Sequence, residues 1–117
     1  MTDDKRAAIA FICGIKFISR NINYLYDCTR NKYCFYILQH VDKNQISVYD
    51  FDTKNIIMGR LPQLFDYATR SYLHINFKDK KAQGFDYQTS NFFSVSVSKL
   101  TITVFDYKEN NFFSYIV

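Results

Sequence analysis

An aromatic residue followed by aspartate recurs along the chain, at Tyr26-Asp27, Tyr49-Asp50, Phe65-Asp66, Phe85-Asp86 and Phe105-Asp106. Turn-like residues follow each pair, and a new apolar run follows each turn. The last three copies begin twenty residues apart, and the earlier intervals are 23 and 16 residues. A period near twenty indicates a repeated supersecondary unit. The pattern predicts five β-hairpins, each with its turn after the Asp.

The composition favours strands over helices. The chain has 12 Phe and 10 Tyr but only one Glu and five Ala, and aromatic and branched side chains suit a pleated, half-buried surface. We therefore predict a mainly β fold for residues 1–117 as a single domain, with an N-terminal helix within residues 1–20 and five aromatic-Asp hairpins in residues 21–117. The hairpins would form an antiparallel meander of about eight to ten strands, as an open sheet, a sandwich or a barrel.

The run from Ala7 to Ile18 is almost wholly apolar, and Thr2, Asp3 and Asp4 precede it. Thr or Asp at this position can cap a helix, and acids suit its positive end. A helix that is apolar nearly all round is typically buried. A membrane-associated helix and a first strand are the alternatives, although a membrane span needs roughly 20 apolar residues.

Alternation along the strands predicts which side chains share a face. In the last hairpin we expect a strand from Leu100 to Tyr107, a turn at 108–111 and a return strand from Phe112, with Asp106 opposite Phe113. The expected core face then carries Leu100, Ile102, Val104, Asp106, Phe113, Tyr115 and Val117, with Phe93, Val95 and Val97 from the preceding hairpin and Leu73, Ile75 and Phe77 from the third.

The opposite face is expected to gather aromatic side chains near the turns. We call ten of them the aromatic band and take them as candidate binding residues: Tyr49, Phe65, Tyr67, Tyr72, Phe85, Tyr87, Phe92, Phe105, Tyr107 and Phe112. The band could pack on itself or under the N-terminal helix. If left exposed, it would be a large apolar patch, which usually marks a partner surface. A homo-oligomer interface and a small-ligand platform are therefore the functional alternatives.

The five repeated aspartates, Asp27, Asp50, Asp66, Asp86 and Asp106, lie one residue inside each expected turn. A carboxylate there can accept hydrogen bonds from loop amides, which stabilises turns that lack glycine. On alternate strands of a flat sheet they would stand about 9–10 Å apart, too far to share a calcium ion. We expect a structural turn role, with Asn55, Asn91 and Asn111 supplying the left-handed positions of the loops.

The charge and the cysteine content of the chain argue against several classes of function. The net charge is +4 and no basic stripe is present, so we expect no nucleic-acid partner. The three cysteines have no zinc-site spacing, which suggests free thiols in a reducing cytoplasm. No nucleophile elbow, phosphate loop or dinucleotide fingerprint occurs. We expect no catalytic residue, no metal, no cofactor and no membrane partner.

The unit FDYQTSNFFSVSV resembles the repeats of small uncharacterised bacterial proteins that carry YDY-type hairpins after a short helix. The resemblance covers residues 5–117 and implies a β-hairpin array of bacterial or phage origin. More loosely, the unit is similar to the YD repeats of Rhs-type toxin shells, whose Gly-Arg-Leu after the turn is absent here. The expected function is a non-enzymatic structural or interaction module, acting as a homodimer or with another protein. The alternatives are a carbohydrate-like ligand binder and an inhibitor or immunity protein.

Overall fold

A computed structural model gives the fold. It describes residues 1–41 and 43–117, and the side chains of these except His40 and Val41. One helix precedes ten strands, in the order α1 (Asp3–Phe17), β1 (Tyr24–Asp27), β2 (Lys32–Val41), β3 (Gln45–Asp50), β4 (Asn55–Arg60), β5 (Gln63–Asp66), β6 (Ser71–Lys78), β7 (Lys81–Asp86), β8 (Asn91–Ser98), β9 (Thr101–Asp106) and β10 (Asn111–Ile116).

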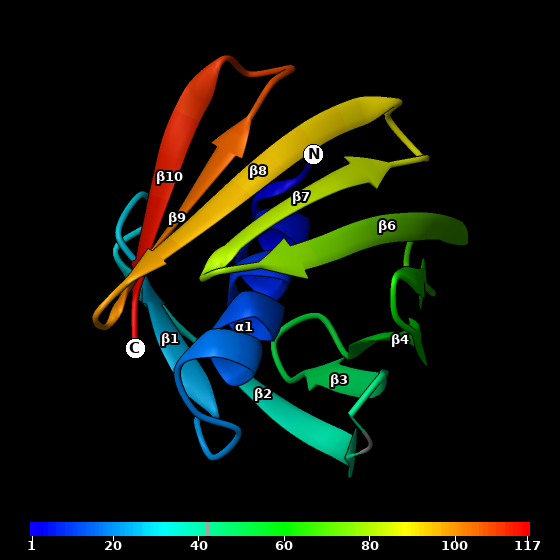
Figure 1. Cartoon of the computed structure of the whole chain (residues 1–117), viewed down its shortest axis with the longest axis horizontal. Coiled ribbons are helices and arrows are strands. Elements are labelled where there is room, and N and C mark those ends of the chain that lie inside the picture. The colour runs from blue at the N-terminus through cyan, green and yellow to red at the C-terminus, as the bar shows by residue number, and fades with distance from the viewer. Residues whose placement is uncertain (42) are drawn as a thin grey trace.

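The ten strands form a closed antiparallel barrel (Figure 1). Each strand pairs with the next along the chain, and β10 returns to pair with β1 through Tyr26 opposite Ile116 and Asp27 opposite Tyr115. The predicted mainly β meander with one N-terminal helix is therefore confirmed. Of the three architectures that the sequence allowed, the barrel is the one observed, and closure leaves no unpaired edge strand.

Four-residue loops join the strands at the end where the repeated Asp residues lie. The last residue of each loop has a positive φ near 50–60°, at Asn31, Lys54, Arg70, Ser90 and Asn110. The prediction that Asn55, Asn91 and Asn111 take this conformation was wrong by one residue, because each of them is the first residue of the returning strand. Only Asn31 and Asn110 match the preference of asparagine for the left-handed region.

At the other end of the barrel, two-residue turns connect β4 to β5, β6 to β7 and β8 to β9. Asp79 and Lys80 both have positive φ, as the type I′ turns of tight hairpins require. Lys99 and Leu100 form the two-residue turn between β8 and β9, in which Lys99 has a positive φ. Leu100 was expected on the core face, but it is exposed because the strand begins one residue later, at Thr101.

The register of the last hairpin also differs from the expected one. Asp106 pairs with Asn111, and Phe113 pairs with Val104, so the loop spans residues 107–110 rather than 108–111. The shift moves each pairing by two residues, and side chains alternate with a period of two, so the side chains within β9 and β10 stay on their expected faces. The core prediction is confirmed on this face for six residues, all buried: Phe93, Val95, Val97, Ile102, Val104 and Phe113.

Helix α1 fills the interior of the barrel (Figure 1). Thr2 caps it by accepting a hydrogen bond from the Lys5 amide at 3.1 Å, and every residue from Lys5 to Ile15 is buried. The prediction of a buried helix is confirmed, and the alternative of a first strand was wrong. No helix in the described part of the chain is long and apolar enough to cross a membrane.

Candidate functional site

All five repeated Asp side chains point into the barrel, around the first turn of α1, and all five are buried. Each accepts a hydrogen bond from an amide of its own loop: the donors are Thr29 and Arg30 for Asp27, Asp52 for Asp50, Ala68 for Asp66, Gln88 for Asp86, and Lys108 and Glu109 for Asp106. This geometry is that of an Asx turn, which replaces the conformational freedom of glycine with a side-chain hydrogen bond.

Two cations of α1 reach these carboxylates. Lys5 Nζ lies 2.5 Å from Asp86 Oδ1 and 3.2 Å from Asp66 Oδ2, and Arg6 Nη1 donates to Asp106 Oδ2 at 3.0 Å. Both cations are buried, which is tolerated in a protein interior only when the charge is paired. The sequence prediction gave Lys5 and Arg6 no role, although two cations at the start of an otherwise apolar helix were a signal that acids would face them.

The carboxylates lie closer together than the flat-sheet estimate suggested. Asp66 and Asp86 share one ammonium nitrogen, because side chains that point inward converge toward the axis of a closed barrel. Within the described residues, no group of His, Cys, Asp and Glu side chains is arranged to hold a metal ion. Asp66, Asp86 and Asp106 pair with the cations of α1, and Asp27 pairs with Arg30 at 2.7 Å.

Asparagine side chains link neighbouring hairpins at this end of the barrel. Asn91 Nδ2 donates to Asp106 Oδ1 at 2.6 Å, and Asn55 Nδ2 donates to Asp66 Oδ1 at 2.7 Å. Burial alone would raise the pKa of Asp106. Hydrogen bonds from Asn91 and the Glu109 amide have the opposite effect, and so does nearby positive charge that includes Arg6. Together they lower the pKa of Asp106 below its ordinary value of 3.8. The ionised form of Asp106 is therefore favoured in the fold.

The lowered pKa of Asp106 predicts a specific loss of stability in acid. A carboxyl whose pKa is lower in the folded state stabilises the fold above its unfolded pKa, and this contribution disappears as pH falls through the folded pKa. We expect the difference in unfolding free energy between the wild type and Asp106→Asn to be constant above about pH 5 and to shrink below about pH 4. Urea denaturation between pH 2 and 7 measures it. Exposed Asp79→Asn is the control, and a difference independent of pH would contradict the prediction.

The aromatic band lies on the outer face of the barrel, near the same four-residue loops. In the last three hairpins it is built from three-ring clusters, in each of which a half-buried Phe contacts two exposed rings. Phe85 lies 4.9 Å from Tyr87 and 4.7 Å from Phe92 between ring centroids, and Phe105 lies 4.7 Å from both Tyr107 and Phe112. Phe65 has the same arrangement with Tyr67 and Tyr72, and Tyr49 contacts Phe51.

The band packs on itself and not under α1, which lies on the other side of the barrel wall. Barrel closure does not cover it either. Its six outer rings are 51–65% exposed: Tyr67, Tyr72, Tyr87, Phe92, Tyr107 and Phe112. The sequence prediction missed Tyr26 and Tyr33, whose rings meet at 5.0 Å in the first hairpin. They align with Phe105 and Phe112, so the repeat itself carried the signal.

The other side chains considered in the sequence, the three cysteines and His74, have surroundings that fit structural roles. Cys13, Cys28 and Cys34 are free thiols, and burial raises the pKa of the Cys13 and Cys34 thiols, which leaves them less reactive. His74 lies on the outer face between Gln63 and Asn76, at 3.1 and 3.0 Å.

The fold and its repeated clusters were compared with known proteins. We found no match to this chain among protein-family models, curated proteins or solved structures.

Proposed function

We propose that the protein is a non-enzymatic interaction module that forms a homodimer through the part of the aromatic band that lies on the three hairpins of β5–β10. The observation that carries this proposal is the set of six band rings exposed on three consecutive hairpins. Monomeric soluble proteins rarely expose large contiguous apolar patches, and patches of this kind mark interaction surfaces. The three free thiols support a reducing, cytoplasmic compartment. We also propose that the protein is of bacterial origin.

The size of the band suits a protein interface. A Phe or Tyr side chain buries about 150–250 Å² when it is fully covered, so six half-exposed rings offer roughly 600 Å². A stable interface buries about 800 Å² on each partner, and its centre is enriched in Tyr and Phe. The band would therefore supply most of one side of such an interface, with the polar outer positions beyond it, such as Ser94 and Ser96, forming the rim.

The chemistry of the band favours a second copy as its partner. On β7–β9 the outer positions next to the band, Gln83, Ser94 and Thr103, are uncharged, and Lys81 lies at the far end of β7 from the band. Two copies can therefore meet with few like charges brought together. The band also repeats every twenty residues. A two-fold axis can then place the cluster of one hairpin on the equivalent or neighbouring cluster of the partner, as an isologous interface requires.

Sedimentation equilibrium at micromolar concentration tests this proposal. We expect the mass of a dimer for the wild type and the 13.9 kDa mass of one chain for Tyr87→Ser/Tyr107→Ser. Phe35→Ser is the matched control, because Phe35 is a similarly exposed ring on β2 outside β5–β10, and this variant should remain dimeric. All three proteins should keep a far-ultraviolet circular dichroism spectrum typical of β-structure and a cooperative thermal transition, since the substituted rings are exposed.

A wild type that is strictly monomeric would overturn the dimer and favour the second candidate, a carbohydrate-like ligand. A groove of about 260 Å³ on the outer face joins the rings of Phe105, Tyr107 and Phe112 to the hydroxyls of Ser94 and Thr103. Ligand sites of this type combine aromatic surface with a few polar groups. Quenching of tyrosine fluorescence by an oligosaccharide, lost in Tyr107→Ser without a change in mass, would then identify the function. Binding of a different protein, as by an inhibitor or immunity protein, would leave the wild type monomeric until that partner is added.

A further inference from the structure

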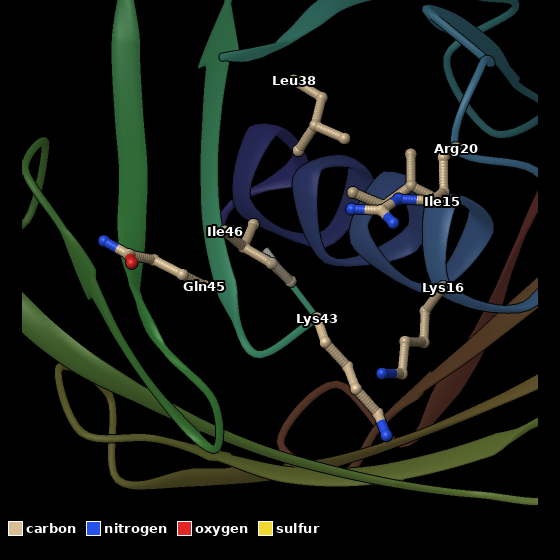
Figure 2. A pocket seen from close by; sticks show the side chains of 7 residues that line it. All are labelled: Ile15, Lys16, Arg20, Leu38, Lys43, Gln45 and Ile46. Atoms are coloured by element: carbon tan, nitrogen blue, oxygen red, sulfur yellow. The ribbon is translucent and has the colours of Figure 1, made fainter. Parts of the chain in front are cut away.

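A pocket of about 370 Å³ lies at the end of the barrel where α1 finishes, opposite the buried carboxylates (Figure 2). Its lining comes from three separate segments: the last turn of α1 with the residues after it, strand β2, and the start of β3 with the residue two before it. The lining residues are Ile15, Lys16, Arg20, Leu38, Lys43, Gln45 and Ile46. None of them belongs to the aromatic band, so this pocket is independent of the proposed dimer interface.

The floor of the pocket is aliphatic. Ile15 and Ile46 are buried, and Leu38 is half-buried beside them. The pairing of β2 with β3 shifts by one residue between Leu38 and His40, and such bulges bend a strand and are common at barrel rims. The shift occurs directly beside Leu38, at the wall of the pocket. The hollow therefore coincides with a local irregularity of the barrel rather than with a regular strand pair.

Among the residues that the structure describes, the rim of the pocket carries three cations and no acid. Lys16 and Lys43 extend toward the same side of the pocket, and Arg20 reaches over it from the segment after α1 (Figure 2). No ion pair of Lys16, Arg20 or Lys43 occurs in the described part of the chain; Lys16 Nζ lies 5.5 Å from the centroid of the Phe77 ring. At the other end of the barrel, by contrast, Lys5 and Arg6 are each paired with carboxylates.

The helix end does not cancel this positive charge. Carbonyl oxygens at the C-terminus of a helix carry partial negative charge and disfavour a nearby anion. Gly14 O, however, already accepts hydrogen bonds from Ile18 N at 2.8 Å and Ser19 N at 3.1 Å. Three full positive charges facing one apolar hollow outweigh the remaining dipole, because the helix end is equivalent to only about half of one charge.

We propose that this pocket binds a single-chain amphiphilic anion, with its carboxylate or phosphate head among Lys16, Arg20 and Lys43 and its aliphatic tail on Ile15, Leu38 and Ile46. An anion would relieve the repulsion among the three cations, and a tail would fill the hollow above the aliphatic floor. Ligand sites commonly have volumes of about 300–1,000 Å³, so this pocket lies at the small end of that range. It suits one chain of medium length rather than a two-chain lipid.

Titration of the full chain with decanoate, followed by amide chemical shifts, tests the proposal. We expect saturable shifts at Ile15, Leu38 and Ile46, and at least tenfold weaker binding for Arg20→Gln/Lys43→Gln. The matched control is Lys54→Gln/Lys108→Gln, which removes the same charge from loops at the opposite end of the barrel and should leave the affinity unchanged. Equal weakening in both double variants would attribute the effect to net charge and overturn the site.

Ligands that carry only the apolar tail or only the charged head test the two parts of the site separately. Decanol offers the tail without the charge, and inorganic phosphate offers the charge without the tail; each should bind at least tenfold more weakly than decanoate. Phosphate binding as tight as decanoate binding would overturn the role of the apolar floor. Vesicles of phosphatidylglycerol test the other source of the same chemistry. The protein could co-sediment with these vesicles in a way that depends on Arg20 and Lys43, and yet not bind decanoate. This result would overturn the free ligand and identify a membrane surface as what the site binds.

Discussion

Replacing Phe11 by alanine is expected to lower the free energy of unfolding by about 3–5 kcal/mol, the usual cost of truncating a buried Phe. Phe11 is fully buried on α1, and its ring stacks on Tyr36 of β2 at a centroid distance of 4.5 Å. The surrounding barrel cannot collapse into the space because each strand is held by hydrogen bonds on both sides. Urea denaturation followed by circular dichroism measures the loss.

Phe112→Ala is the matched control for Phe11→Ala. It removes the same atoms from a ring that is 65% exposed on the outer face, so the unfolding free energy should change by less than about 1 kcal/mol. Similar losses in the two variants would mean that α1 is not the centre of the core. The pair of variants therefore tests the position of the helix inside the barrel rather than the general importance of aromatic residues.

Replacing Lys5 by methionine should also cost about 3–5 kcal/mol, because removing one partner of a buried ion pair leaves uncompensated charge. Lys5 is the cation shared by Asp66 and Asp86, and all three side chains are buried. The loss is larger than the one expected from a turn aspartate alone, which is about 1–2 kcal/mol for a missing acceptor. Thermal and urea unfolding at neutral pH would measure it.

A rescue experiment isolates the ionic part of this effect. In Lys5→Met/Asp66→Asn/Asp86→Asn the buried negative charges are gone while the turn acceptors remain, so at least half of the lost stability should return. Lys16→Met removes a cation from the exposed end of the same helix and should change stability by about 0.5 kcal/mol or less. A Lys5→Met protein within 1 kcal/mol of the wild type would contradict the paired arrangement.

The faces of the strands could be predicted from the sequence even though their exact pairing could not. Residues such as Val95 and Val97 alternate with polar neighbours, so the period of two assigns each to the core without reference to a partner strand. The turn position was wrong by one residue, because an Asp followed by an aromatic residue does not show which of the two ends the strand. The resulting shift of two residues in pairing preserved the faces within β9 and β10, whereas a shift of one would have inverted them.

The closure of the barrel could not be predicted, because alternation shows that one face is apolar but not what covers it. The same pattern serves an open sheet packed on a helix and a barrel wrapped around one. The pairing of Lys5 with Asp66 and Asp86 depends on closure, since only a curved sheet brings carboxylates from alternate strands to one nitrogen. These contacts join residues more than sixty positions apart, and no local pattern in the sequence connects them.

The two candidate sites also differ in how far each could be predicted from the sequence. Most of the aromatic band could be predicted, because its members repeat with the hairpins and lie on one face. The cation-rimmed pocket could not, because Arg20, Leu38 and Lys43 come from separate segments and none of them belongs to the repeat. The sequence indicated this pocket only through a lysine near the end of an apolar helix. That lysine also fits the ordinary preference of cations for a helix C-terminus.

The position of α1 inside the barrel has a consequence for how the chain is made. The helix leaves the ribosome before any of the strands that enclose it, and β10, which closes the barrel against β1, emerges last of the elements. Synthesis at about 5–20 residues per second separates the two events by roughly 5–20 s. During that interval the apolar surface of α1 has no complete cover. Nascent chains of this protein should therefore depend on chaperone contact at α1, and the barrel should close only after translation has passed β10.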